Sequence, residues 1–416
     1  MNKKLSHFLG KIKEDIVNAF RVLLREYQLI ITDLGVLILL VVVPLVYPVL
    51  YSFIYYPQVV RDMPVSVVDL SNSPASRDYI RSLNATPEVK IEHQCLSMEE
   101  AIVRFKKGQN NGIIVLPESF SKDIATGQQA NVSIYADMKF FLHYKTLMMG
   151  SAFVTLQKGN DIQIERLMGG GLSAHQAEAQ ANPILLNGNA IANPSGGFAT
   201  YGIPAALMLI IQQALVLSIG ILAGTSRERH AGGLLVPPDK RRMGTLRLVL
   251  GKSAAYFSIY LVLSVYMLAF IPRIFGYPQM AGAGELLALV IPYLLSAIFM
   301  GMTLSVLFKN RESPMLLYLF ASFPLLFLSG IVWPLSNMSP LWLAVREVFP
   351  SSNAMYGFIK MNTLGATIAE TRKEIMGLWV QSGVYFLTAC LVYGKQVRIA
   401  ETERRTYKEK ETVALL

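Results

Sequence analysis

The chain has 416 residues, of which 53% are hydrophobic and only 16% charged, and its mean hydropathy is +0.41. Soluble globular domains carry about 25% charged residues, so this composition indicates a membrane protein. The net charge of +10 comes from short basic clusters beside apolar runs and not from one basic face of a polar domain, which predicts no nucleic-acid partner.

An amphipathic helix is predicted at the start of the chain. Apolar side chains recur every three or four residues from Ile12 to Ile30, and basic residues lie off this stripe. Because the stripe leads directly into an apolar run, residues 1–33 are predicted to form a cytoplasmic helix in the membrane interface; an ordinary soluble amphipathic helix is the alternative. The stretch "MNKKLSHFLGKIKED" shows neither the short apolar core nor the small-residue cleavage site of a signal peptide, so the first span is expected to act as an uncleaved signal.

Six apolar runs are predicted to span the membrane as helices, since a span needs about 20 apolar residues. They cover residues 34–56, 199–223, 253–271, 286–308, 315–334 and 375–393. Basic residues gather at the N-terminus, in the 224–252 loop, at residues 309–311 and in the 394–416 tail, which predicts that these parts and both termini are cytoplasmic. The expected fold class is an α-helical polytopic membrane protein with six transmembrane helices.

Residues 57–198 are predicted to form an inserted α/β extracytoplasmic domain. Four β-rich runs, at 65–70, 89–93, 111–117 and 131–137, alternate with helical stretches, which favours a largely parallel sheet. A longer amphipathic helix is expected at about residues 139–168, ended by three glycines.

The segment 335–373 is predicted to form an outer re-entrant hairpin. Its apolar run "PLWLAV" is too short to cross a bilayer and is bracketed by Pro340 and Pro350. A simple amphipathic surface helix is the alternative.

No catalytic, metal or nucleotide site is predicted in this chain. The nearest approach to a phosphate-binding loop, Gly244 to Gly251-Lys252, has six residues between its glycines where the motif has four, and it follows no strand. Lys252 is expected to extend to the cytoplasmic interface. The central parts of the spans contain no charged residue, which argues against proton or sodium coupling. The amides of Gln212, Gln213 and Gln381 have two interpretations, interhelical hydrogen bonding and substrate contact.

The basic loop after the second span reads "RERHAGGLLVPPDKRRMG". Its arginines indicate only that it faces the cytoplasm. The Gly232-Gly233 break, the Leu234-Leu235 pair and the Pro237-Pro238 stop predict a short helix that presents its leucines to a partner's groove.

The order of the interfacial helix, the first span, the outer domain, the basic loop and the outer hairpin resembles that of the type 2 ABC exporter permeases. Within that family the chain resembles the subgroup with a large outer domain between the first two spans. The resemblance covers nearly the whole chain. It includes "VSVVDLSNSPASRDYIRSL" in the outer segment and "LSGIVWPLSNMSPLWLAVREVFPSSNAMYGF" near the last span.

In that family the loop after the second span contains a charged turn with a glutamate, a glycine, a Leu-Leu pair and a proline, and it forms a coupling helix that docks on an ATPase. The similar positions here are Arg227, Glu228, Arg229, Gly232, Gly233, Leu234, Leu235 and Pro237. His230-Ala231 departs from the pattern, since further charge is common there, and this leaves the docking contacts open.

The resemblance implies a subunit without a cofactor or metal of its own, paired with a second copy or a paralogue. Each permease would bind a separate ABC ATPase subunit, which holds ATP and Mg. The substrate is expected to move outward from the cytoplasm or inner leaflet, in contact with membrane lipid, along Gln212, Gln213, Phe320, Phe323 and Phe327.

The resemblance also implies the bacterial cytoplasmic (inner) membrane as the location, with a periplasmic adaptor as a candidate partner of the outer domain. Two other functions stay open from the residues. One is a membrane-anchored envelope binding module that uses its outer α/β domain without transport. The other is a secondary transporter.

Overall fold

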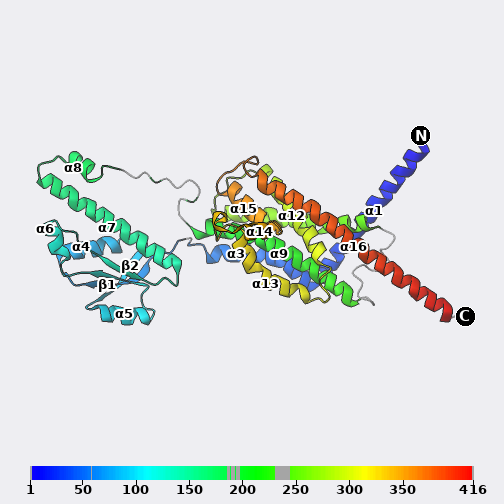
Figure 1. Cartoon of the computed structure of the whole chain (residues 1–416), viewed down its shortest axis with the longest axis horizontal. Helices are drawn as coiled ribbons and strands as arrows, with labels where there is room; N and C mark the ends of the chain where they lie inside the picture. The colour runs from blue at the N-terminus through cyan, green and yellow to red at the C-terminus, as the bar shows by residue number, and fades with distance from the viewer. Residues whose placement is uncertain are drawn as a thin grey trace. The chain divides into compact units, whose positions relative to one another are not determined.

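The structure is a computed structural model that describes residues 2–57, 59–184, 188, 193, 197–229 and 244–414. It divides into two compact units (Figure 1). The first unit comprises residues 1–58 and 190–416, and the second comprises residues 59–189.

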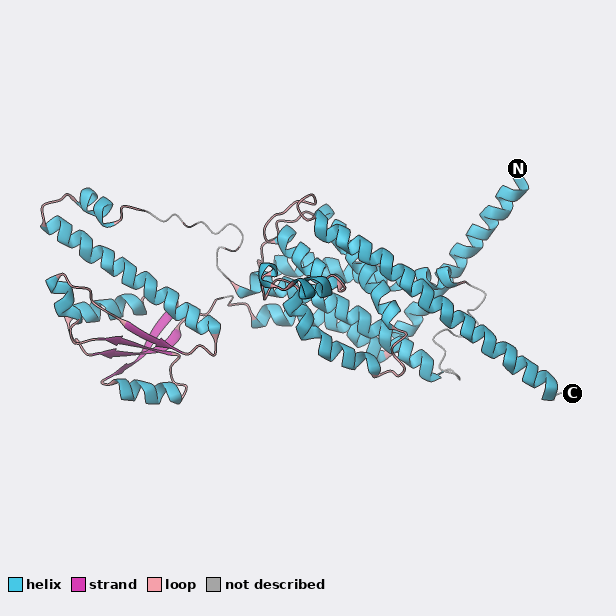
Figure 2. Ribbon diagram, viewed as in Figure 1, coloured by secondary structure: helices cyan, strands magenta, loops and turns pink. Residues whose placement is uncertain are grey.

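The described part of the first unit consists of helices and their connections (Figure 2). In chain order the helices are α1 (Asn2–Thr32), α2 (Leu34–Leu37), α3 (Val43–Ile54), α9 (Phe198–Arg229), α10 (Thr245–Val265), α11 (Ile271–Ile274), α12 (Ala283–Leu304), α13 (Ser313–Leu328), α14 (Pro340–Arg346), α15 (Pro350–Asn362) and α16 (Arg372–Ala414). Short π-helical stretches at Ile38–Val42 and Tyr266–Phe270 join α2 to α3 and α10 to α11. The first of them ends two residues before Pro44, a residue that lacks the N–H needed to continue regular α-helical bonding.

Five helical stretches in the described residues are long and apolar enough to cross a membrane. They are Leu34–Ile54, Gly202–Arg229, Thr245–Ile274, Ala283–Leu304 and Arg372–Ile399. The predicted span at 315–334 coincides with α13, which is apolar but has only 16 residues. Helix α13 ends just before Gly330, whose φ of +86° stops the helix. The chain is therefore a mostly helical polytopic membrane protein with five candidate spans, and the sixth span stays a prediction.

Helices α9 and α10 extend further than the predicted spans. Helix α9 continues to Arg229, so Arg227, Glu228 and Arg229 lie in its last turn and not in the predicted 224–252 loop. Hydropathy marks where the apolar surface ends, whereas arginine and glutamate are good helix formers and arginine favours a helix C-terminus.

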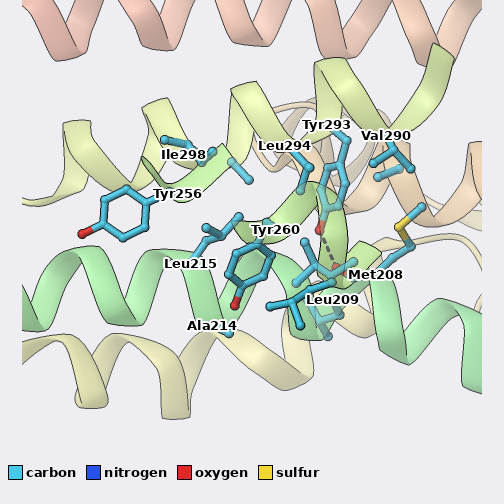
Figure 3. Packing of buried hydrophobic residues seen from close by; sticks show 14 of the residues in the cluster. Met208, Leu209, Ala214, Leu215, Tyr256, Tyr260, Val290, Tyr293, Leu294 and Ile298 are labelled. Carbon is cyan, nitrogen blue, oxygen red and sulfur yellow. Dashed lines mark hydrogen bonds between the residues drawn. The ribbon is translucent and has the colours of Figure 1, made fainter. Parts of the chain in front are cut away.

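The core of the first unit lies where α9, α10 and α12 pack together. Tyr256, Tyr260 and Tyr293 are fully buried there among aliphatic side chains (Figure 3). The Tyr293 hydroxyl donates a hydrogen bond to the Met208 carbonyl oxygen of α9. Buried phenols usually find such a partner, and this bond fixes one contact between α12 and α9.

The second unit contains a four-stranded sheet with helices on both faces (Figures 1 and 2). Its strands are β1 (Met63–Asp69), β2 (Val89–Cys95), β3 (Gly112–Leu116) and β4 (Ser133–Ala136). Their order is β2-β1-β3-β4; β1 pairs in parallel with β2 and β3, and β4 pairs antiparallel with β3.

Alternating side chains of β1 pack on different helices, because successive residues of a strand point to opposite faces. Val65 and Val67 belong to a core formed with α4 (Pro74–Asn84), α6 (Phe120–Thr126) and α7 (Phe141–Gly169). Val68 instead packs with α5 (Met98–Lys106) on the other face. After a run of glycines, α8 (Ala174–Ala181) follows α7.

Candidate functional site

An apolar cavity of about 430 Å³ lies between α3, α9 and α13. Its volume falls within the range of about 300–1,000 Å³ that is typical of small-molecule sites. Tyr51 of α3 and Tyr55, which caps its C-terminus, line it with stacked rings whose centroids are 6.5 Å apart. Tyr318 and Phe323 line it from α13. The wall contributed by α9 consists of small and aliphatic side chains, namely Gly202, Ile203, Ala205, Ala206, Leu209 and Ile210.

Gln213 supplies a polar group to this wall. It is buried on α9, and its side-chain Nε2 has no hydrogen-bond partner in the described part of the chain. An unpaired buried amide donor is costly unless something binds it. The cavity therefore suits an apolar or aromatic molecule that carries a hydrogen-bond acceptor.

Gln212, the neighbouring residue, has a different environment. It is buried, and its Oε1 accepts a hydrogen bond of 2.7 Å from the backbone N–H of Ser351. Ser351 lies in the first turn of α15, where N–H groups have no partner within the helix. Gln212 thus bonds one helix to another and is not among the residues that line the cavity.

The three predicted pathway phenylalanines lie on the exposed side of α13. Phe320, Phe323 and Phe327 are all exposed, and of these only Phe323 lines the cavity. Of the five predicted pathway residues, the structure places Gln213 and Phe323 at this cavity, and the pathway itself stays a prediction.

The predicted coupling residues divide into two groups. Gly232, Gly233, Leu234, Leu235 and Pro237 lie outside the described residues. Arg227, Glu228 and Arg229 are described, and they lie at the end of α9.

Arg311, in the turn between α12 and α13, joins the end of α9 to the start of the first span. Its backbone N–H donates to Glu228 Oε1 over 2.9 Å. Its two terminal guanidinium nitrogens donate to the two carboxylate oxygens of Asp33 over 2.5 and 2.6 Å, and one of them also reaches Thr225. These hydrogen bonds from Arg311 hold the pKa of Asp33 below its usual value of 3.8. In return, Asp33 raises the pKa of Arg311.

A second ion pair, more deeply buried than the first, attaches α1 to α10. The Glu26 carboxylate is buried and accepts from Lys252 Nζ over 2.5 Å and from the Tyr256 hydroxyl over 3.0 Å. The expected extension of Lys252 to the interface is therefore replaced by a charge pair inside the unit. Its signal in the sequence was spacing, because Glu26 lies four residues from both Val22 and Ile30, on the buried face of α1.

Comparison with known proteins relates this architecture to transporters. A family model described as "ABC-2 family transporter protein" matches residues 34–391. The chain is also 21% identical over 303 residues to ABC transporter G family member 20 of Dictyostelium discoideum. That similarity covers 71% of this chain and 39% of the relative, so the chain spans well under half of the relative's length.

Proposed function

Since the chain belongs to the ABC-2 family of transporter proteins, we propose that it is the permease subunit of an ATP-driven exporter. Two permeases, identical or paralogous, pair in the membrane, and each binds a separate ATPase subunit that holds ATP and Mg. The match to a transporter family and the five apolar helices long enough to span a membrane both support the permease role. In this proposal the chain moves the substrate and its partner hydrolyses ATP.

The observation that carries the transport proposal is the cavity between α3, α9 and α13. Its aromatic and aliphatic wall, with the single unpaired amide of Gln213, suits an amphiphilic substrate taken from the cytoplasm or inner leaflet. Phe320 and Phe327 are exposed on the same face of α13 as Phe323 but do not line the cavity, and they are the proposed contact with the second permease.

The proposed orientation follows the basic clusters of the sequence. Both termini and the loop after α9 lie in the cytoplasm of a bacterial cell, and the sheet-containing unit lies outside the inner membrane, where an adaptor can reach it. In this orientation α13 completes a sixth span, and α14 and α15 form the outer hairpin. Helix α15 is largely buried, which supports a re-entrant element over a surface helix.

The direct test is copurification from the native host. The full chain, tagged at its C-terminus and extracted in mild detergent, is expected to bring down an ABC ATPase, and the complex in proteoliposomes is expected to transport only with ATP. A chain that purifies without an ATPase, and binds ligands through residues 59–189 alone, would instead be the membrane-anchored binding module.

Replacing Leu234 and Leu235 with serine is expected to uncouple transport. The two leucines are proposed to fill a groove of the ATPase, and each buried leucine contributes about 1.5–3 kcal/mol through its apolar surface. Substrate-stimulated ATP hydrolysis is expected to fall to the unstimulated rate, while membrane insertion stays intact. The control is Leu96→Ser, at a leucine that is 92% exposed in the second unit. Unchanged stimulation in the double variant would contradict the assignment.

Filling the cavity between α3, α9 and α13 is expected to block substrate binding while the ATPase subunit stays bound to the chain. In Ala206→Trp the indole occupies space that the substrate needs, so the affinity for hydrophobic fluorescent dyes is expected to fall by about tenfold or more, equivalent to at least 1.4 kcal/mol. The control is Val262→Trp, at a residue of α10 that is 70% exposed. Equal dye transport by the two variants in inverted vesicles would place the pathway elsewhere.

A further inference from the structure

A second cavity, of about 440 Å³, lies where α1 gives way to α2, beside the end of α9. Three arginines line it, each from a different element: Arg25 from α1, Arg229 from α9 and Arg311 from the turn before α13. The hydroxyls of Thr32, Thr225 and Ser226 add polar groups to the same wall. None of these residues lines the cavity between α3, α9 and α13.

The lining is positively charged. Asp33 is the one carboxylate among the described residues that line it, so three positive charges and one negative charge give a formal sum of +2. Asp33 is bonded to Arg311 through both of its oxygens. Glu228 lies nearby, bonded to the Arg311 backbone, but it does not line the cavity. A ligand with a negative charge is therefore favoured.

The rest of the lining includes apolar side chains. Leu29, Leu34 and Leu222 line the cavity, and Leu34 is the first residue of the first candidate span. Leu34 is 70% exposed and the adjoining Ile31 is 66% exposed. Arginines therefore meet exposed leucine at the end of a span, which is the depth at which a phospholipid changes from headgroup to acyl chain.

We propose that this cavity binds the phosphate-bearing headgroup of an anionic phospholipid, whose acyl chains lie along Leu34. Arginine forks match phosphate oxygens in pairs, and hydroxyls complete the shell. Basic recesses between membrane helices recognise anionic headgroups in this way. Because Arg229 ends α9 immediately before the proposed coupling loop, a bound headgroup holds the helix end from which that loop starts.

The test uses the full chain, delipidated in detergent and titrated in native mass spectrometry. The probes are phosphatidylglycerol, phosphatidylcholine and inorganic phosphate. We expect phosphatidylglycerol to bind most tightly, and Arg25→Gln with Arg229→Gln to weaken it by about tenfold or more while phosphatidylcholine binding is unchanged. The control is Arg21→Gln, an exposed arginine one turn earlier on α1 that does not line the cavity.

Three outcomes overturn the proposal. Equal binding of the two lipids removes the role of charge, and an equal loss in the Arg21 control places the lipid elsewhere on α1. Binding of inorganic phosphate as tight as that of phosphatidylglycerol makes the site a free-anion site. If the double variant does not purify, Arg229→Gln alone applies the same test at the exposed end of α9. The test needs neither an ATPase nor transport, so its result stands apart from the proposed function.

Discussion

Gly224→Ala is expected to destabilise the helical unit by about 3 kcal/mol, the upper part of the range for overpacking a dense interior. A Cβ at Gly224 would collide with the Asn310 carbonyl group, lying 2.5 Å from its carbon, and would lie 2.8 Å from the Arg311 backbone nitrogen. These are backbone atoms, which cannot rotate out of the way as a side chain can. The measurement is the melting temperature of the full chain in detergent.

The matched control is Gly383→Ala in α16. No described atom outside the local helix lies within 4 Å of a Cβ built there, so the added methyl meets open space. Alanine also favours a helix over glycine by about 1 kcal/mol, so this variant is expected to melt at the same temperature or higher. If Gly224→Ala and Gly383→Ala have the same melting temperature, the turn before α13 does not pack on α9 as the structure shows.

Gly224 belongs to a small-residue seam on α9. Gly220, one turn earlier, would place a Cβ 2.8 Å from both Phe308 and Pro314, so the chain from α12 to α13 lies along both glycines. Glycines four residues apart let membrane helices and turns approach closely. This close approach brings Arg311 within reach of Asp33 and Glu228.

Local patterns in the sequence located most helices and strands, because periodicity is a property of neighbouring residues. The four β-rich runs coincide with β1 to β4, and the apolar runs coincide with α3, α9, α10, α12 and α16. Helix ends were less predictable, since α9 runs through charged residues to Arg229. The sixth predicted span stays a prediction, because α13 ends at Leu328, before the apolar run does. Composition does not show that Gly330 adopts the positive φ that ends this helix.

The site depended on partners that no local pattern contains. Gln212 and Gln213 are equivalent in the sequence, but adjacent residues on a helix diverge by about 100°, so one meets α15 and the other the cavity. Asp33 and Arg311 are 278 residues apart in the chain. Only the folded structure, in which the turn at 309–312 lies beside the N-cap of α2, shows that they form one pair.

Arg311→Gln is expected to cost about 2 kcal/mol of stability, since hydrogen bonds to charged groups contribute about 1.5–3 kcal/mol and solvent weakens this pair. The Asp33 side chain is 10% exposed and that of Arg311 is 38% exposed. The variant leaves Asp33 without its bidentate partner and loosens the start of the first span from the turn that packs on α9. The melting temperature of the full chain in detergent, compared with wild type, measures this cost.

Acidic pH is expected to remove the difference in melting temperature between the wild type and Arg311→Gln. The folded pKa of Asp33 lies below its usual value of 3.8, so the pair stabilises the fold fully above that value and is lost as the pH falls through the lowered pKa. Melting temperatures should therefore differ at neutral pH and converge under acid, below the usual Asp value. Arg273→Gln is the control: Arg273 is exposed and donates to the neutral Gln279. A gap that persists unchanged in acid, or appears equally in the control, would show that Arg311 acts through packing and not through its charge on Asp33.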